Sequence, residues 1–321
     1  MARPFLIDTD TASDDAVAMI MALRHPDVEV VAITTVSGNV PLDQCVKNAL
    51  YTTELCEADV PVYAGADRPL VRAATHATWF HGQDGLGDVG YKTSREPADG
   101  HAVDVLIDTA RERQGLTLVT LGPLTNVALA LERAPDLTRR IERCVVMGGA
   151  ANTVGNVTPA AEFNIWADPD AARSVFRSGL PIEMVGWELC RGEATLHDSD
   201  MALVRGFGNP IADFALDCNR TALIASKEQS GEPGLDLPDP VAMAVAIEPG
   251  VVTRSSRCYI QVEAASDLTR GMTVVDQLDV THDERNAEVW GPLRQSPPHV
   301  EVCWEIDVGK WKDLLYRSLR G

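Results

Sequence analysis

Short apolar runs alternate along this chain with segments whose apolar residues recur every three or four positions. The runs are rich in Val and Ile and almost continuously apolar, which is typical of parallel strands buried on both faces. The intervening segments are typical of amphipathic helices. This alternation predicts an α/β fold with a Rossmann-like, open, mostly parallel central sheet flanked by helices. Strands are expected at 4–7, 28–36, 60–62, 116–121, 144–147 and 182–185, and helices at 14–24, 43–57, 102–114 and 125–133.

The last third of the chain has a different pattern. Residues 196–230 are expected to be mostly helical and to end in a Pro- and Gly-containing loop at 231–240, and residues 251–262 and 272–276 are expected to be late strands. The sequence contains no internal repeat, low-complexity tract or Gly/Ser linker. We therefore expect one domain over residues 1–321.

Polar or Gly-rich stretches follow four of the expected strands, at 8–15, 37–39, 122–126 and 148–156. Ligands of open α/β sheets bind beyond the carboxyl ends of the strands. The four stretches therefore predict a binding site along one edge of the sheet.

Charge and cysteine content restrict the possible partners. With 47 acidic and 28 basic residues, the formal net charge is −19, which argues against a nucleic-acid partner. The acidity promotes solubility and also suits a cation site. The seven cysteines form no CxxC pair, so we expect reduced thiols and no zinc site. Without a signal-like or membrane-spanning apolar segment, a soluble, cytoplasmic protein with no membrane contact is expected.

The strongest chemical signal is the stretch DTDTASDD at residues 8–15. Four carboxylates in eight residues repel one another at neutral pH unless a cation compensates them. Ca²⁺ or Mg²⁺, which prefer oxygen ligands, would suit this loop. Capping of the following helix would explain one or two of the acids, but not four.

The same stretch resembles the N-terminal fingerprint of the inosine–uridine-preferring nucleoside hydrolase family, DTDxGxDDAxA. Thr11 and Ala12 depart from the usual Pro and Gly but remove no candidate ligand. Further similar stretches follow in order over roughly residues 3–280, and the ordered series is far more specific than any one motif. These stretches are AITTVSGNV at 32–40, HGQDGLG at 81–87, GPLTN at 122–126, MGG at 147–149, GN at 155–156, AEFNI at 161–165, DP at 168–169 and DP at 239–240.

The resemblance implies a Ca²⁺-dependent enzyme that hydrolyses the N-glycosidic bond of ribonucleosides. Asp10, Asp15 and Asp239 would bind Ca²⁺ through carboxylate oxygens, together with the backbone carbonyl of Leu121. A mixed shell of this kind suits an ion that accepts 6–8 oxygens. Asp10 would also take a proton from the attacking water as general base.

The resemblance also implies contacts to the sugar, whose reacting carbon acquires oxocarbenium character. Taken alone, Asn39 and Asn156 are also compatible with turns, and Met147 with the core. The implied contacts are Asp14 and Asn164 near the 2′- and 3′-hydroxyls, Asn156, Glu162 and Met147 near the 5′ end, Asn39 near the sugar–base junction, and Phe163 and Trp166 beside them.

One departure from the family pattern concerns the departing base. Many members have His directly before the late Asp, where this chain has Pro238, which has no proton to give. His81 is the candidate replacement, and aromatic stacking by Trp79, Trp166 or Trp187 is an alternative. A slow enzyme, or a substrate with a better leaving group, is a third possibility. The preferred base and the rate are left open.

Two other functions are compatible with parts of the sequence. A haloacid-dehalogenase-like phosphatase also begins with a strand and DxD, with Asp8 as nucleophile, although Ala12 does not fit that motif. Phosphate release that is sensitive to Asp8→Asn would support it. A nucleoside-binding member without turnover would bind ribose but release no sugar.

The family resemblance further implies a small ribonucleoside as partner and a homodimer or homotetramer.

Overall fold

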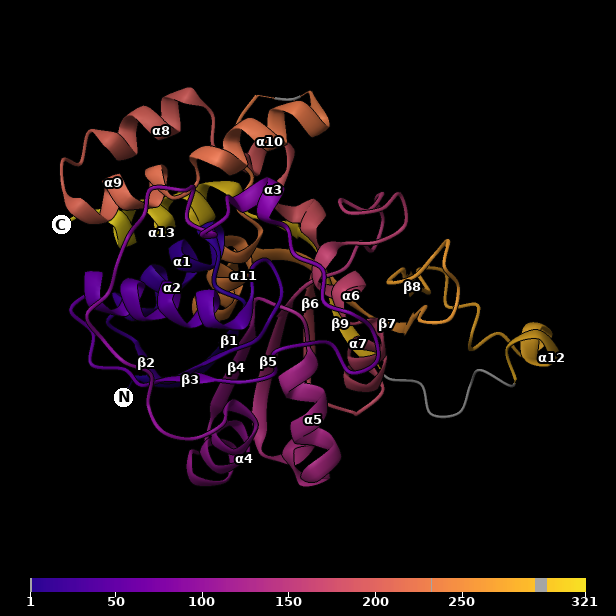
Figure 1. Cartoon of the computed structure of the whole chain (residues 1–321). Coiled ribbons are helices and arrows are strands. Elements are labelled where there is room, and N and C mark those ends of the chain that lie inside the picture. Colours follow the sequence, from indigo (N-terminus) through magenta and orange to yellow (C-terminus); the bar gives the residue numbers. More distant parts are fainter. Residues whose placement is uncertain (1, 232, 292–298) are drawn as a thin grey trace.

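A nine-stranded sheet forms the centre of the molecule (Figure 1). The computed structural model describes residues 2–231, 233–291 and 299–321. The strand order in the sheet is β3-β2-β1-β4-β5-β6-β9-β7-β8. The strands are β1 (Arg3–Thr9), β2 (Val28–Thr35), β3 (Val62–Ala64), β4 (Leu116–Thr120), β5 (Ile141–Met147), β6 (Ile182–Val185), β7 (Val252–Val262), β8 (Thr273–Val275) and β9 (His299–Ile306).

Most of this sheet is parallel. Strands β1 to β6 and β9 pair in parallel, whereas β7 runs antiparallel to β9 and β8 runs antiparallel to β7. The α/β fold with a mostly parallel sheet is therefore confirmed. The six early strands lie where the apolar runs predicted them, with ends that differ by up to three residues.

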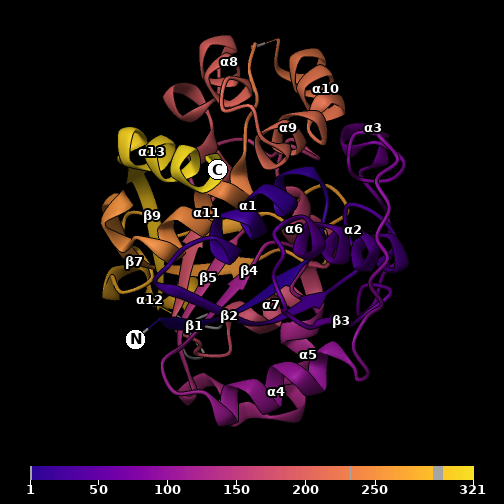
Figure 2. The same ribbon diagram turned by 90° about the vertical axis from the view of Figure 1, so that its left-hand side faces the viewer.

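Successive side chains of the central strands pack against helices on opposite faces of the sheet. Phe5 and Ile7 belong to the apolar cluster of α1, α2, α11 and α13, whereas Leu6 belongs to that of α4, α5 and α7 (Figure 2). Helices α8, α9 and α10 extend the first cluster outward. The α-helices are α1 (Ser13–Leu23), α2 (Leu42–Leu55), α3 (Thr78–His81), α4 (Ala102–Glu112), α5 (Thr125–Arg133), α6 (Phe163–Ala167), α7 (Pro169–Phe176), α8 (Asp198–Arg205), α9 (Pro210–Asp217), α10 (Arg220–Ser230), α11 (Pro238–Ile247), α12 (Ala287–Trp290) and α13 (Val308–Leu319).

The strand order reverses between β1 and β4. The chain runs from β1 outward through β2 to β3 and then returns to β4 on the other side of β1. The connections that leave the carboxyl ends of β1 and β4 therefore diverge to opposite sides, which opens a crevice at this edge. The acidic loop follows β1, so the topology sets it at this crevice.

Several late elements were not predicted from the sequence, among them α11, β9 and α13. Helix α11 begins at Pro238, inside the expected loop 231–240, because Pro is compatible with the first turn of a helix. Strand β9 lies between β6 and β7, and its buried Val300 and Val302 alternate with Glu301 in the period of two that marks a strand. Helix α13 follows β9 and packs on α1 and α11.

The composition led us to expect reduced cysteines and no membrane-spanning segment. All seven cysteines are free, and six of them are buried, as expected for reduced thiols. Over the residues that the structure describes, no helix is both long enough and apolar enough to cross a bilayer.

Candidate active site

The acidic loop is buried from Asp8 to Asp15, because β1 and α1 are both central elements. Asp8 lies apart from the other three acids. Its Oδ1 accepts hydrogen bonds from Thr34 Oγ1 at 2.6 Å and Asn126 Nδ2 at 2.8 Å, and burial raises its pKa to about 6. Asp8 is not among the residues that line the neighbouring cavity.

Asp14 and Asp15 meet Asp239, an acid from a distant part of the chain. One carboxylate oxygen from each of Asp14, Asp15 and Asp239 lies within 4.8 Å of the others. Asp239 is the second residue of α11, and α11 packs along α1. Asp15 is held by Thr9 Oγ1 at 2.5 Å and by the backbone N–H of Ala12 at 2.9 Å. The packing of two buried helices therefore creates this cluster.

Asp10 lies beside this cluster between two glycines. Its Oδ2 accepts a hydrogen bond from the backbone N–H of Asn39 at 2.6 Å. A Cβ on Gly38 would lie 2.0 Å from Oδ2, and one on Gly122 would lie 2.8 Å from Oδ1. Both positions therefore require glycine so that the backbone can approach the Asp10 carboxylate. The carbonyl oxygen of Leu121, next to Gly122, accepts a hydrogen bond from Asn164 Nδ2 at 2.7 Å.

Burial and mutual repulsion both disfavour the charged forms of these acids. Burial raises the pKa of Asp10 and Asp239 well above its usual range, and the neighbouring carboxylates raise it further. Burial is also the main cause that raises the pKa of Asp14 and Asp15 to about 6. A bound cation would relieve the repulsion and favour the charged carboxylates.

The donor set fits a hard divalent cation. Within the described residues, Asp10 Oδ1 and Asp14 Oδ1 are buried oxygens without a hydrogen-bond partner. Buried oxygens rarely lack a partner, and an ion is one explanation when they do. Carboxylate and carbonyl oxygens are the ligands that Ca²⁺ and Mg²⁺ prefer. The buried acidic cluster is thus consistent with a metal site of this kind.

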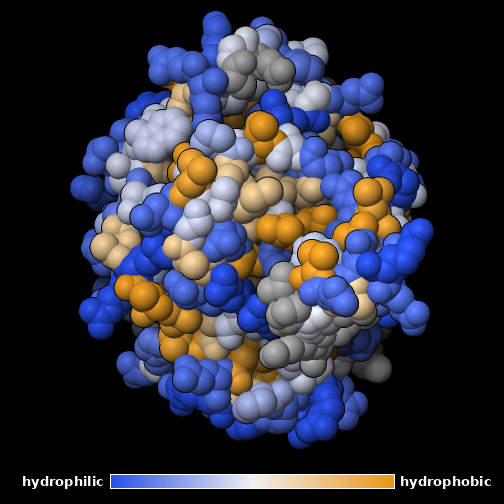
Figure 3. Space-filling model, turned by 90° about the vertical axis from the view of Figure 1, so that its right-hand side faces the viewer, coloured by the Kyte–Doolittle hydropathy of each residue, from blue (hydrophilic) through white to orange (hydrophobic). Residues whose placement is uncertain are grey.

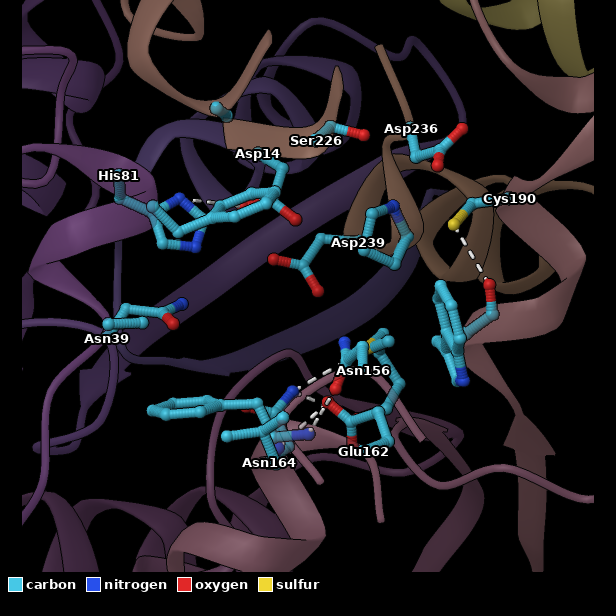
Figure 4. A pocket seen from close by; sticks show the side chains of 18 of the residues that line it. Asp14, Asn39, His81, Asn156, Glu162, Asn164, Cys190, Ser226, Asp236 and Asp239 are labelled. Atoms are coloured by element: carbon cyan, nitrogen blue, oxygen red, sulfur yellow. Dashed lines mark hydrogen bonds and ion pairs between the residues drawn. The ribbon is translucent and has the colours of Figure 1, made fainter. Parts of the chain in front are cut away.

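A cavity of about 250 Å³ opens above the acidic cluster. Figure 4 shows the carboxylates of Asp14 and Asp239 near its centre, between His81 and Asn39 on one side and Asn156 and Glu162 on the other. Asp10 and Asp15 are fully buried and do not line the cavity. The expected site residues that do line it are Asp14, Asn39, His81, Leu121, Met147, Asn156, Glu162, Phe163, Asn164 and Asp239.

Several of the expected sugar-binding residues form a hydrogen-bonded group around α6. Glu162 precedes this helix and accepts hydrogen bonds from the backbone N–H groups of Asn164 at 2.8 Å and Gly149 at 2.8 Å. Burial raises the pKa of Glu162 to about 7 although these donors oppose the shift. Asn156 Oδ1 accepts from the backbone N–H of Phe163 at 3.0 Å. Glu162 therefore also has a structural role that the sequence did not indicate.

Trp166 was expected to lie beside the substrate. Trp166 does not line the cavity. The Arg270 guanidinium lies 4.1 Å from the centre of its ring, and Arg270 Nε donates to its backbone oxygen at 3.1 Å. The other two tryptophans that were considered, Trp79 and Trp187, do line the cavity.

His81 and Pro238 both line the cavity. The ring Nδ1 of His81 lies 2.8 Å from Ser13 Oγ and 3.7 Å from Asp14 Oδ1. Burial lowers the pKa of His81 to about 4, although Asp15 opposes the shift. The imidazole is therefore neutral at pH 7, and a neutral imidazole can donate one hydrogen bond.

Sequence reasoning missed several polar residues of the cavity wall. The segment around α10 was expected only to be helical, and no spacing in the sequence marked which of its side chains would face a ligand. Asp236 accepts a hydrogen bond from Thr195 Oγ1 at 2.6 Å, and the Arg191 guanidinium lies 4.5 Å from the centre of the Trp187 ring. The missed polar residues are Ser13, Arg191, Asn219, Ser226, Gln229 and Asp236.

The fold and the site define an α/β enzyme whose polar centre lies where the strand order reverses, with buried carboxylates under a small-molecule cavity. The model of the inosine-uridine preferring nucleoside hydrolase family matches residues 5–313. The chain belongs to this family, and it is a nucleoside hydrolase.

Individual relatives agree with this assignment over almost their whole length. The chain is 40% identical over 323 residues to the pyrimidine-specific ribonucleoside hydrolase RihA of Shewanella sp. (strain ANA-3), covering 99% of this chain and 96% of that protein. The structure resembles a plant nucleoside hydrolase, PpNRh1, with a TM-score of 0.90, 30% identity and complete coverage of both chains. It also resembles a purine-preferring ribonucleoside hydrolase from Gardnerella vaginalis, with a TM-score of 0.88, 31% identity and coverage of 99% and 98%.

Proposed function

We propose that this protein is a Ca²⁺-dependent ribonucleoside hydrolase with Asp10 as the general base. The observation that carries the proposal is the convergence of Asp10, Asp14, Asp15 and Asp239 beneath a cavity of sugar size. These carboxylates come from distant parts of the chain, and their burial is costly without a cation. Packing alone therefore does not explain why they are there.

Four groups would hold the ion. They are the carboxylates of Asp10, Asp15 and Asp239 and the carbonyl oxygen of Leu121, which are all buried oxygen donors of the kind that suits Ca²⁺. When bound, the divalent cation supplies positive charge that neutralises these acids and lowers the pKa of a water molecule. Asp14 belongs to the same geometric cluster, but it also lines the cavity, so we assign it to the sugar.

Asp10 is the base because one of its oxygens is still available. Oδ2 is held by Asn39, whereas Oδ1 has no partner among the described residues and can accept a proton from water. The water oxygen bonds to C1′, the C1′–N bond breaks, and its electron pair leaves with the base. Asp10 later releases its proton, and the base takes one up, so the reaction balances.

The sugar would be gripped from the cavity floor and from α6. Asp14 and Asn164 would contact the 2′- and 3′-hydroxyls, and Asn39 would lie near the sugar–base junction. Contacts of this kind accelerate the reaction only if they fit the oxocarbenium-like sugar better than the ground state. Asn156, Glu162, Met147 and Phe163 would surround the 5′ end.

Departure of the base would be assisted by His81. Pro238 lines the cavity at the position before Asp239 and has no hydrogen to donate. His81 also lines the cavity, and its neutral ring is a hydrogen-bond donor. A donor of this kind stabilises the negative charge that develops on the leaving base.

Pyrimidine ribonucleosides are the substrates that we propose first. The relative named pyrimidine-specific is 40% identical to this chain, whereas the structural neighbour named purine-preferring is 31% identical. Higher identity over the full length favours the pyrimidine class.

The proposal is tested by measuring release of reducing sugar from uridine, cytidine, inosine, guanosine and adenosine, with and without a calcium chelator. We expect hydrolysis fastest for uridine or cytidine, and we expect the chelator to abolish it. Asp10→Asn should lower kcat by roughly 10²- to 10⁴-fold, because it removes the proton acceptor. A near-normal kcat in Asp10→Asn with an unchanged calcium requirement would refute the assignment of the base.

The absence of a histidine before Asp239 supports one second candidate, a nucleoside-binding protein without turnover. Ribose would then bind with measurable heat in a calorimeter, but none of the five nucleosides would be hydrolysed over days. Turnover of any one of them excludes this candidate.

We also propose that the protein self-associates and that it folds as one domain. The face that carries β8 and α12 presents several apolar side chains to solvent, which supports a homodimer or homotetramer (Figure 3). Helices α8, α9 and α10 share the apolar cluster of α1 and α11, which supports one domain over residues 1–321. The exposed apolar residues of that face include Val274, Leu268, Leu278 and Val289.

A further inference from the structure

We infer that Ser13 is a positioning residue for the leaving base: its hydroxyl donates to His81 Nδ1 and so fixes the ring with its N–H on Nε2, toward the cavity. The inference rests on the proposed function and extends it to a residue that contacts neither the ion nor the bond that breaks. It also gives a reason for a polar residue at the first position of a helix that is otherwise buried and mostly apolar.

The hydrogen bond joins two elements that close one side of the cavity. Ser13 Oγ and His81 Nδ1 are 2.8 Å apart, and both residues line the cavity. Ser13 is the first residue of α1, and His81 is the last residue of α3. Figure 4 shows the His81 ring at the side of the cavity, with its second nitrogen turned away from the hydrogen bond.

The direction of this hydrogen bond follows from the partners of the hydroxyl. A hydroxyl carries one hydrogen, which needs an acceptor when it is buried. Ser13 is fully buried, and within the described part of the chain His81 Nδ1 is the one hydrogen-bond partner of its Oγ. Nδ1 is therefore the acceptor, and in a neutral imidazole the remaining hydrogen is then on Nε2.

The position of Ser13 is itself fixed from a third element. Asn219 Nδ2 donates to the Ser13 backbone oxygen at 3.3 Å and to the Ala215 oxygen at 2.9 Å. Both partners are carbonyl oxygens, so the amide group of Asn219 must face them. The Ser13 backbone is thereby tied to Asn219, the residue that precedes α10.

The expected effect depends on the leaving group. Ser13→Ala should lower kcat for uridine roughly 10- to 100-fold with KM within about threefold, because the His81 ring loses its orientation. It should change hydrolysis of 4-nitrophenyl riboside by less than about threefold, since nitrophenolate leaves with little help. Ser13→Thr keeps the hydroxyl and should recover most of the uridine activity. Ser318→Ala, which removes a buried serine hydroxyl from α13, is the matched control for stability.

Two further arms make the inference falsifiable. In a His81→Ala background, Ser13→Ala should have no additional effect on uridine hydrolysis, whereas additive losses would overturn the inference.

Nitrogen NMR of the wild-type protein, labelled with ¹⁵N-histidine, should show His81 with its hydrogen on Nε2. This measurement does not depend on the folding of any variant. A hydrogen on Nδ1, or equal losses on both substrates, would refute it. If the wild-type protein releases sugar from neither substrate, the proposed function fails, and the NMR arm still decides the Ser13–His81 contact.

Discussion

At the scale of single residues, the Asp10 carboxylate depends on neighbours that have no side chain. Gly38 follows β2 and Gly122 follows β4, and each brings its backbone against one of the two carboxylate oxygens. Neither glycine has a positive φ angle, so the requirement at these two positions is space and not backbone conformation.

Gly38→Ala is therefore expected to displace Asp10. Its Cβ would lie 2.0 Å from Asp10 Oδ2, a distance that forces the carboxylate or the loop to move. We expect loss of about 1–3 kcal/mol of stability, as for overpacking, and a fall in kcat of roughly 100-fold or more because the base is misplaced. Urea denaturation and the uridine assay measure the two effects.

The control for this substitution is Gly250→Ala. Apart from the Lys310 ammonium group at 3.8 Å, its Cβ would meet nothing within 4 Å, so stability and activity should both stay near wild type. Wild-type activity in Gly38→Ala would mean that Asp10 does not need its observed position.

At the scale of elements, α11 connects the site to the opposite end of the sheet. All its residues after the first are buried, and Asp239 in its first turn faces the cavity. At its far end, Arg143 Nη1 donates to the Ala246 oxygen at 3.0 Å, while its Nε and Nη2 bind Glu183 at 2.7 and 2.9 Å. The guanidinium thus supplies donors to the last carbonyls of the helix, and the Ala246 oxygen also accepts from Arg3 Nη1 at 3.3 Å.

Arg143→Ala should accordingly destabilise the protein through α11. It leaves the Glu183 carboxylate without its partner and removes the Arg143 donor from the Val245 oxygen, and the Arg143 and Glu183 side chains are both mostly buried. We expect a loss of about 2–4 kcal/mol in the free energy of unfolding, read from urea denaturation.

Arg113→Ala provides the comparison on the surface. The Arg113–Glu29 pair spans 3.2 Å, and both side chains are about half exposed, so its loss should cost below about 1 kcal/mol. Equal destabilisation by the two variants would contradict the role given to Arg143.

At the scale of the whole molecule, the charges of the site affect folding itself. Burial raises the pKa of Asp14 and Asp15 to about 6 in the protein without a bound cation, whereas an unfolded aspartate has a pKa of about 3.9. The folded form then binds more protons than the unfolded form between about pH 4 and 6. Its stability therefore falls as the pH rises through this window.

This linkage predicts how calcium and pH act together. Protein dialysed free of divalent ions should have a lower melting temperature at pH 7 than at pH 5. Added calcium should raise the melting temperature much more at pH 7, because the ion competes with protons for the same oxygens. Scanning calorimetry at both pH values measures this, and an equal calcium effect at both would contradict it.

Much of the fold could be predicted because its information is local. Strand β6 and helix α5 lie at the expected residues, and the other early elements that were expected differ only at their ends, whereas α3, α6 and α7 were not predicted. Buried parallel strands require continuous apolar runs, so a short window of sequence is enough to find them. Among the elements that were missed, α11 and β9 are buried in contacts with distant segments, and Pro238 concealed the start of α11.

The order of acids in residues 8–15, together with the motifs that follow, determined the family and the residues of the candidate site. Only the tertiary structure decided which of those residues meet. It joined Asp239 to the acidic loop through α1 and α11, left Asp8 and Trp166 outside the lining of the cavity, and brought Ser13 to His81. The reason is physical: periodicity specifies which face of an element is buried, whereas contacts between side chains depend on the packing of elements that are distant in sequence.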